Sequence, residues 1–373
     1  MTVCPENKCL GCGLCASLCP HGCISMREND LGELHPFVDE SACTSCSLCI
    51  RMCPANDTMV FHEPLACYAA QNTDSEELKG SSSGGIGALL ASAFPETAFG
   101  TTVNEKLEAV VTRGCARDFK GSKYVQSIIS PNVYREIKNT AGKSPAIFIG
   151  TPCQVAAVQS LCGGYDNPVT VDLLCHGVCP PSYLKEELFP ILAEVPFASH
   201  LSFRNGNEFR LALSDDSGKI LYSKPALEQK YFRAFLEGIS LREICYSCPF
   251  SRQERISDIT IGDFIGRKGQ ISFVSANTQK GKELLEKIAG THTQLRLEQC
   301  AYSERFAYPY SILEPCPKSK LRKSFVRTYR AKGYTAAMKK LARRWLMQNS
   351  AISLYRRIHH IAHLAKMAIA EKL

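Results

Sequence analysis

The sequence predicts a mixed α/β (α+β) protein with a small cysteine-rich domain in front and a basic helical tail behind. Three observations predict it. Residues 9–20 and 43–54 repeat one cysteine pattern 34 positions apart. Between residues 106 and 290, short apolar segments of strand length alternate with helical segments. Residues 318–373 hold fifteen Lys or Arg and a single acid, Glu371.

These observations divide the chain into four expected parts. They are the cysteine-rich domain, the N-terminal and C-terminal parts of the body, and the tail, over residues 1–62, 63–145, 146–317 and 318–373. The N-terminus has neither a basic segment nor an apolar segment of signal-peptide type, so we expect a cytoplasmic location. In that reducing compartment, clustered cysteines are more often metal ligands or redox groups than disulfides.

The first part carries a ferredoxin-type cysteine spacing twice. Each copy reads C-x2-C-x2-C-x3-C-P, which is typical of bacterial two-cluster 4Fe-4S ferredoxins. Three thiolates on a tight loop wrap one corner of a cluster, and in such ferredoxins the fourth cysteine of each run serves the other cluster. One expected ligand set is therefore Cys9, Cys12, Cys15 and Cys53, and the other is Cys43, Cys46, Cys49 and Cys19.

Zinc is the alternative for four cysteines, but zinc sites usually pair two C-x2-C units without a third cysteine or a Cys-Pro ending. The spacing favours iron–sulfur clusters. Cys4 and Cys23 flank the first run outside this spacing, and we expect them to be buried thiols without a ligand role.

The body reads as alternating strands and helices. Strands are expected in residues 106–114, 145–150 and 168–175, with a helix after Thr151 and another from Ser182. Residues 201–223 contain two turn signals, Asn-Gly and Ser-Gly, and predict an antiparallel meander. Residues 258–264 and 271–290 return to strand and helix.

Two further patterns in the body suggest binding. Cys153 and Cys175 lie near strand ends, and Cys245 with Cys248 form a CxxC pair, so these four could hold a third cluster. Cys179 competes with Cys175, and a lone CxxC can equally bind zinc or act as a dithiol. The segment GSSSGG, residues 80–85, precedes a helical segment and can bind phosphate or serve as a flexible linker.

Six motifs in order resemble one family. They are SSSGGIGALL, GSKYVQS, IFIGTPCQVAAV, VDLLCHGV, CYSCPFSRQERISDITIGDF and NTQKGKELL, behind the two-run domain. Together they resemble the coenzyme F420 hydrogenase/dehydrogenase beta-subunit family over residues 1–290. Its members are FAD-containing iron–sulfur oxidoreductases, so the resemblance implies FAD and a third cluster in a flavin-binding body.

The resemblance also implies site residues. It assigns the third cluster to Cys153, Cys175, Cys245 and Cys248. It places the flavin on Ser81, Ser83, Gly84, Gly85, Ser122, Lys123, Tyr124 and Gln126. Arg255, Asp258 and Asp263 match the family pattern, with chemical or structural roles both open.

Two departures from the family leave questions open. Cys179 stands where relatives commonly have proline, so either Cys175 or Cys179 could be the fourth core ligand. Ile265 stands where they commonly have tryptophan, so the substrate is not transferred.

The tail gives the chain its basic balance. It carries a net charge of +14, so the rest carries −6 of the total +8. Apolar residues recur at helical intervals from Leu341 and Trp345 through Ala368, which indicates an amphipathic helix for an anionic membrane surface, an acidic protein, or packing on the body. The acidic body and the absence of a reading motif argue against nucleic acid.

The sequence therefore predicts an oxidoreductase that relays electrons between a ferredoxin or another redox protein and a small organic substrate. One-electron clusters and a flavin that handles one or two electrons would connect the two. The alternatives are a noncatalytic electron-transfer subunit of a larger complex and an iron–sulfur protein without flavin.

Overall fold

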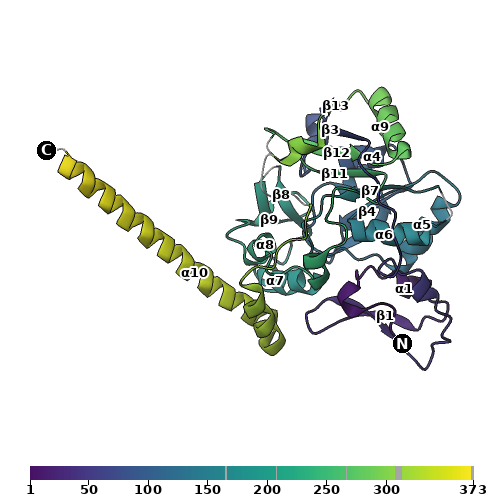
Figure 1. The fold of residues 1–373 in the computed structure, drawn as a ribbon, viewed down its shortest axis with the longest axis horizontal. Helices are drawn as coiled ribbons and strands as arrows, with labels where there is room; N and C mark the ends of the chain where they lie inside the picture. The colour runs from purple at the N-terminus through teal and green to yellow at the C-terminus, as the bar shows by residue number, and fades with distance from the viewer. Residues whose placement is uncertain (164–165, 207, 266, 307–312, 371–373) are drawn as a thin grey trace. The chain divides into compact units, whose positions relative to one another are not determined.

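One eight-stranded mixed sheet organises residues 1–318, with the strand order β13-β3-β12-β11-β7-β6-β4-β5 (Figure 1). The computed structural model describes residues 1–163, 166–206, 208–265, 267–306 and 313–370, and side chains up to residue 347. The strands are β3 (Ala66–Asn72), β4 (Ala98–Val103), β5 (Ala109–Gly114), β6 (Ile147–Gly150), β7 (Val169–Leu173), β11 (Ile259–Asp263), β12 (Ser272–Ala276) and β13 (Leu295–Gln299).

The centre of this sheet is parallel and its flanks are antiparallel. Strands β4, β6, β7 and β11 run parallel to one another, and every residue of β6 is buried. Central parallel strands are covered on both faces, which explains the uninterrupted apolar sequence of β6. β5, β12, β3 and β13 add antiparallel pairs at the two sides.

Helices cover both faces of the sheet. One core includes apolar residues of α4 (Ile86–Ser92) and α9 (Gln279–Thr291). The other includes residues of α5 (Pro131–Ala141) and α6 (Pro152–Leu161), together with Leu10 and Leu14 from the cysteine-rich domain. The cysteine-rich domain thus shares a hydrophobic core with the body, which fixes its position.

The cysteine-rich domain is built from short elements. It contains the 3-10 turn η1 (Glu6–Lys8), helices α1 (Leu14–Leu18) and α2 (Leu48–Arg51), and the antiparallel strands β1 (Ile24–Glu28) and β2 (Leu34–Val38). Both helices begin within a cysteine run, so each run is a loop that turns directly into a helix.

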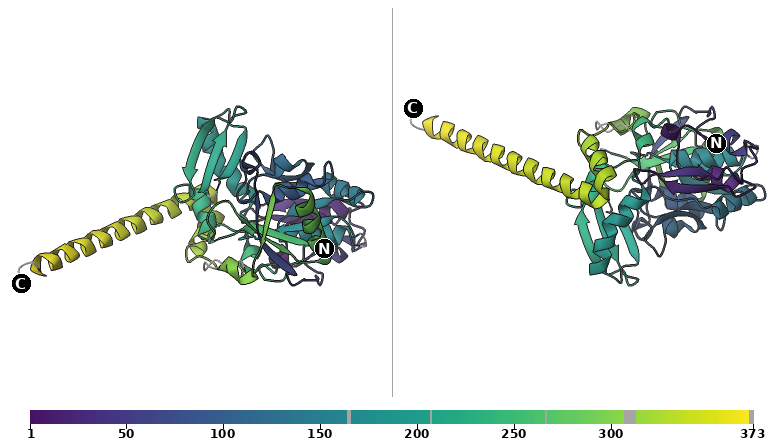
Figure 2. Two further views of the ribbon diagram at one scale, coloured as in Figure 1. Left: turned by 90° about the horizontal axis from the view of Figure 1, so that it is seen from above. Right: turned by 90° about the horizontal axis from the view of Figure 1, so that it is seen from below.

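A second sheet stands apart from the first (Figure 2). It comprises β8 (His200–Asn205), β9 (Glu208–Ser214) and β10 (Ile220–Pro225), and helices α7 (Pro181–Glu194) and α8 (Lys230–Leu236) flank it in sequence. The remaining short elements are α3 (Ser75–Leu78), η2 (Ala116–Phe119), η3 (Glu243–Ser247) and η4 (Tyr302–Phe306).

The tail, residues 319–373, forms a second unit. Its helix α10 (Arg322–Ala370) is interrupted at Gly333, where φ is 76°. The Lys340 ammonium donates to the Thr328 hydroxyl at 3.3 Å, so the chain reverses at this glycine. The predicted apolar face extends to Ala368, and the part of it beyond Met347 lies outside the described side chains. In the described part of the chain, no helix has the length and apolarity needed to cross a membrane.

The predicted fold class is confirmed, and most predicted elements are present. Thr151 caps α6 through a reciprocal capping box with Gln154, and the meander over 201–223 is β8–β10. The prediction that α7 begins at Ser182 was one residue late, because Pro181 occupies its first turn and fixes a helical φ. The flexible-linker alternative for residues 80–85 was wrong, since the Gly84 amide and the Ser83 hydroxyl bond to the β12 region.

A buried ion pair ties β7 to the segment before β11. Arg255 contacts Asp172 at 2.8 Å, and both side chains are almost fully buried. Arg255 also donates to the carbonyl of Phe250 at 3.0 Å. It therefore holds the chain that follows the CxxC pair against the end of β7.

We expect Asp172→Asn to lower the free energy of unfolding by about 3–5 kcal/mol, because it leaves a buried guanidinium without its counter-charge. Glu76→Gln, which breaks the exposed ion pair to Lys79, is the control and should cost less than about 1 kcal/mol. Chemical denaturation under anaerobic conditions measures both. Equal losses would contradict the assigned importance of the Asp172–Arg255 pair.

Candidate functional site

The first cysteine run and one cysteine of the second run line a common cavity. Its lining includes Cys9, Cys12, Cys15 and Cys53. The loop that carries the first three cysteines turns at Gly11 and Gly13, whose φ angles are 63° and 79°. The structure therefore brings together the four residues that the spacing predicts for the first cluster.

The second run forms the matching cavity. Its lining includes Cys43, Cys46, Cys49 and, from the first run, Cys19. Here Ser45 and Ser47 occupy the positions of Gly11 and Gly13 and have φ angles of 57° and 58°. Serine rarely adopts this left-handed conformation, so the loop geometry required around the cavity outweighs the local cost.

Each cavity also contains a fifth thiol. Cys4 lines the first cavity, and Cys23 lines the second with its Sγ 3.2 Å from that of Cys19. Hydrogen bonding from Cys4 lowers the pKa of Cys9 and that of Cys53. The expectation that Cys4 and Cys23 are buried holds, and both lie beside the predicted ligands.

These cavities fit 4Fe-4S clusters. Each presents four thiols from two short loops, and thiolate is the ligand that such clusters take.

A third set of thiols gathers at the end of the parallel strands. Cys153 lies in the first turn of α6, Cys175 follows β7, and Cys245 and Cys248 lie in and just after η3. Burial raises the pKa of Cys175, and the three other thiols raise it further by charge repulsion. Burial also raises the pKa of Cys245 to about 12, and Cys248 and Cys153 act in the same direction. The four side chains therefore lie within electrostatic range of one another.

Cys179 lies in a different environment. It is fully buried, and its Sγ lies 3.2 Å from the hydroxyl of Ser240. Of the two competing cysteines, Cys175 is the one whose surroundings include Cys153, Cys245 and Cys248.

In the described residues, no three His, Cys, Asp or Glu side chains converge closely enough to hold a single metal ion.

The two motifs expected to hold flavin meet beside the second sheet. The amide of Ser122 donates to the hydroxyl of Ser82, which joins the turn at 80–85 to the turn at 121–124. Arg204 of β8 completes the group, because it donates to the Ser82 carbonyl at 2.7 Å and to the Tyr124 hydroxyl at 2.9 Å. Arg204 also pairs with Asp263 at 2.9 Å. The sequence patterns did not indicate Arg204, because a single arginine before a turn carries no spacing signal.

Several of the expected flavin contacts also serve the protein itself. Ser83 donates to the Ile271 carbonyl at 2.6 Å, and the Gly84 amide donates to Ser272 at 2.9 Å. A Cβ on Gly84 would lie 2.3 Å from the Ala70 carbonyl oxygen, so strand packing alone requires glycine there. Ser81 is buried, and Gly85 immediately precedes α4 with φ at 74°.

Lys123 and Gln126 differ in what they face. The ammonium of Lys123 donates to the Lys120 carbonyl at 2.8 Å, and burial lowers its pKa to about 8. Gln126 is turned toward the cysteine-rich domain, where its amide nitrogen donates to the Gly11 carbonyl at 2.9 Å. The structure thus places the Lys123 ammonium beside the start of the turn at 121–124 and Gln126 by the first cavity.

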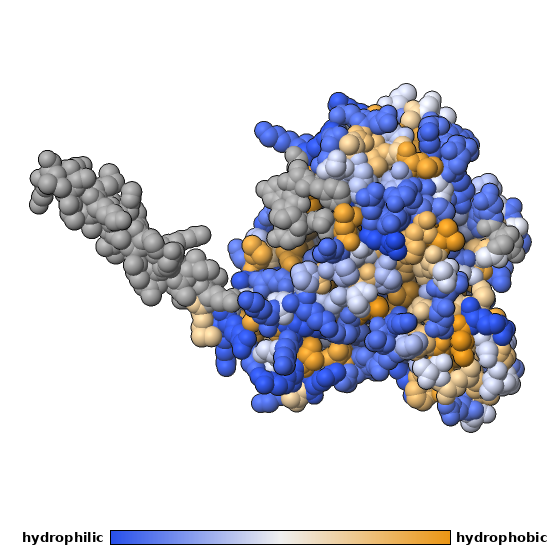
Figure 3. Space-filling model, in the orientation of Figure 1, coloured by the Kyte–Doolittle hydropathy of each residue, from blue (hydrophilic) through white to orange (hydrophobic). Residues whose placement is uncertain are grey.

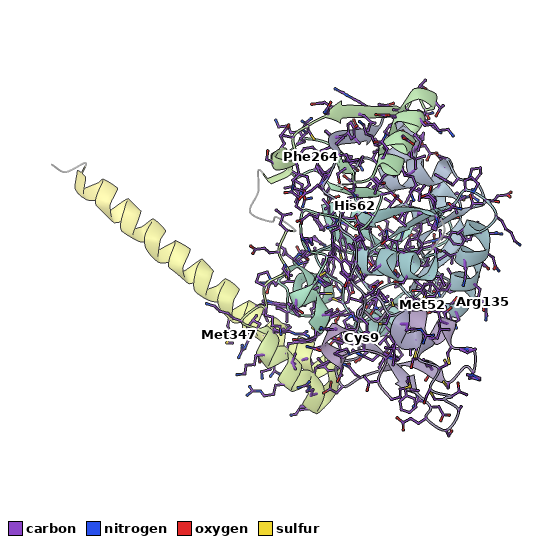
Figure 4. The ribbon with its side chains drawn as sticks, turned by 45° about the vertical axis from the view of Figure 1, so that its right-hand side comes forward. Cys9, Met52, His62, Arg135, Phe264 and Met347 are labelled. Atoms are coloured by element: carbon purple, nitrogen blue, oxygen red, sulfur yellow. The ribbon has the colours of Figure 1, made fainter. Side chains whose placement is uncertain are left out.

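Other body side chains reach the same cysteine loop. The Tyr134 hydroxyl donates to the Cys12 carbonyl at 2.8 Å, and the Arg242 guanidinium donates to the carbonyls of Leu10 and Cys9. Cys9, labelled in Figure 4, lies where the cysteine-rich domain meets the body. Sequence reasoning missed Tyr134 and Arg242, which lie more than 100 positions from the loop.

Two family models match separate parts of the chain. Residues 8–56 match the 4Fe-4S dicluster domain, and residues 145–300 match the C-terminal region of the coenzyme F420 hydrogenase/dehydrogenase beta subunit. A chain from the F420-reducing NiFe hydrogenase complex of Methanosarcina barkeri is 16% identical, with a TM-score of 0.45, over 76% of this chain and 93% of that chain. No curated protein matches.

The two candidate core cysteines make a direct test. We expect Cys175→Ser to lose about four irons per chain and Cys179→Ser to lose none, because only Cys175 lies with the other three thiols. Iron and acid-labile sulfide are counted after anaerobic purification and reconstitution. Loss of iron in Cys179→Ser with full retention in Cys175→Ser would reverse the assignment.

Proposed function

With residues 145–300 identified as the C-terminal region of the coenzyme F420 hydrogenase/dehydrogenase beta-subunit family and residues 8–56 as a 4Fe-4S dicluster domain, we propose an iron–sulfur flavoprotein oxidoreductase. It relays electrons between a ferredoxin-type redox protein and a small organic substrate. The observation that carries the proposal is the convergence of twelve cysteines into three sets, two of them around cavities.

The exposure of the cysteines indicates the order of the clusters along the relay. Cys46 of the second set is exposed, whereas Cys9 of the first set is buried against the body. The second set is therefore the exchange point with an external redox protein. Apolar side chains are exposed in and beside this domain, among them Phe37 and Val60, and Figure 3 shows apolar residues interspersed with hydrophilic ones over its visible face. Such mixed surfaces suit short-lived contacts between redox proteins.

The body residues around the serine-rich turn supply the flavin site. FAD, when bound, would exchange electrons singly with the clusters and in pairs with an organic substrate. Lys123 and Arg204 bring positive charge to the two turns, which suits the diphosphate of FAD. Asp263 holds the Arg204 guanidinium, and Tyr124 packs among Phe203, Phe232 and Phe235. These contacts fix the side chains that border the turn.

A noncatalytic electron-transfer subunit is the second candidate. The description of the family as a beta subunit favours it, because such a chain works with others. The two candidates differ in purified protein. The oxidoreductase, reduced through ferredoxin, bleaches its own flavin and passes electrons to a small molecule, whereas the subunit requires its partner chain.

The tail gives the protein a second contact surface. Ten Lys or Arg residues lie among its described side chains, residues 319–347, and we assign them to an anionic membrane surface at the cytoplasmic face. An acidic protein is the other partner of matching charge.

Cofactor content tests the proposal. We expect anaerobically purified protein to contain about twelve irons, about twelve sulfides and one FAD per chain, because three cubane clusters and one flavin are assigned. Iron, sulfide and acid-released flavin are counted on one sample. About eight irons would contradict the core cluster, and absence of a released flavin would contradict the flavoenzyme.

Removal of residues 330–373 tests the tail. We expect the truncated protein to lose cosedimentation with vesicles of anionic phospholipid at low salt, since about 1 kcal/mol per basic residue near the surface is lost. Neutral phosphatidylcholine vesicles are the control, and added salt should weaken binding of the full chain. Unchanged sedimentation of the truncated protein would contradict the membrane assignment.

A further inference from the structure

Arg242 joins the first cysteine loop to the core thiols. Its backbone amide donates to the Val178 carbonyl at 2.9 Å, and its carbonyl accepts from the amide of Cys245 at 3.0 Å. It therefore precedes η3 at a point held by both the segment after Cys175 and the CxxC pair. Its side chain extends from there to the carbonyls of Leu10 and Cys9.

The guanidinium is enclosed at this junction. Arg242 is 1% exposed, and a Cβ on Gly11 would lie 2.6 Å from its Nη2. Its Nε has no hydrogen-bond partner in the described part of the chain. The arginine thus fills the space between the loop and the body, and one of its polar atoms is buried without an acceptor.

No carboxylate lies within ion-pair distance of this guanidinium. None of the ion pairs within 4.0 Å in the described part of the chain includes Arg242. The buried carboxylate of this junction, Glu33, accepts from the Glu243 amide at 2.7 Å and faces His35 at 3.7 Å. A guanidinium stays charged in proteins, and burial of a charge without an ion-pair partner is strongly unfavourable.

The thiols of the two neighbouring cysteine sets are a further source of negative charge. Leu10, whose carbonyl accepts from Arg242, belongs to a hydrophobic cluster against which Cys153 and Cys248 of the core set also pack. Arg242 also donates to the backbone of Cys9, a predicted ligand of the first cluster. A 4Fe-4S cluster with four thiolate ligands is an anion, and it becomes more negative when it takes an electron.

A structural clamp does not require this charge. Gln126 already holds the neighbouring Gly11 carbonyl at 2.9 Å with a neutral amide, and Tyr134 holds the Cys12 carbonyl with a hydroxyl. Neutral donors therefore already secure the loop next to the carbonyls that Arg242 contacts. What Arg242 adds is a cation between two sets of thiols.

We propose that Arg242 is the shared counter-cation of the first ferredoxin cluster and the core cluster, and that it favours the reduced state of both. This inference rests on the proposed function, since it requires the core cluster. One electron that moves from one cluster to the other remains beside the same positive charge, so the transfer does not separate charge from its counter-ion.

The test compares Arg242→Gln with Arg242→Lys in the full chain. Glutamine keeps a donor for the loop carbonyls and removes the charge, whereas lysine keeps the charge and loses the planar guanidinium that donates to two carbonyls. Arg51→Gln is the matched control, because exposed Arg51 donates to the carbonyl of Cys46 beside the second cluster. Redox titration followed by electron paramagnetic resonance gives the midpoint potential of each cluster, and the signal absent in Cys46→Ser identifies the second cluster.

We expect Arg242→Gln to shift the midpoints of the first and core clusters to more negative potentials and to leave the second cluster unchanged. Arg242→Lys should remain close to the unmodified protein, and Arg51→Gln should change none of the three, since water screens an exposed charge. Unchanged midpoints in Arg242→Gln with full iron content would overturn the proposal. The proposal would also be overturned if the midpoint potentials of all three clusters shifted equally, or if the lysine and glutamine variants showed equal shifts.

Iron retention decides the case in which Arg242→Gln cannot hold all its clusters. The proposal then expects lysine to restore the iron content and glutamine not to, and equal loss in both would overturn it. The count in the unmodified protein separates the two proposals. About eight irons would remove the core cluster and the shared role of Arg242 together, whereas about twelve irons with unmoved potentials would remove only the role of Arg242.

Discussion

The arrangement of the redox sites depends on the hydrogen bonds that the body donates to the carbonyl groups of the first cysteine loop. A loop that wraps a cavity turns its carbonyls outward, and buried carbonyls need donors. The body supplies them from three separate elements through Gln126, Tyr134 and Arg242. These bonds, with Leu10 and Leu14 in the shared core, set the first cavity beside the third group of thiols. The same contacts leave the second cavity at the outer side of the domain, where Cys46 is exposed.

The parallel strands position the other half of the site. Their carboxyl ends present Cys175 directly after β7 and Cys153 at the start of α6, which follows β6. Binding groups in α/β sheets gather at this edge for geometric reasons. The Asp172–Arg255 pair then holds the segment after the CxxC pair to β7, so thiols from three parts of the chain reach one place.

Sequence spacing predicted whatever depends on local geometry. The ferredoxin pattern predicted that each run contributes its fourth cysteine to the other site. Cys53 lines the first cavity and Cys19 lines the second, as predicted. The parallel strands β6 and β7 were predictable as short, largely apolar segments of strand length. Ser45 and Ser47 show the limit of local rules, because their left-handed conformation follows from the repeat of Gly11 and Gly13 and contradicts their own preference. Contacts between distant residues were not predictable: Arg204 and Arg242 act through single long side chains, and β3 and β13 lack a distinctive alternation. The choice between Cys175 and Cys179 likewise required tertiary structure, because only burial and neighbours distinguish them.

The distances along the chain between cysteines have a consequence for maturation. The first three cysteines of each N-terminal run lie within seven residues, so a nascent peptide can bind iron before most of the chain has left the ribosome. Cys153, Cys175 and Cys245 are separated by 22 and 70 positions. Closure of such loops is entropically costly until the sheet has formed and brought their ends together. A cluster held by these residues would therefore be inserted late, into a body that has already folded, and would need an opening through which its delivery could occur.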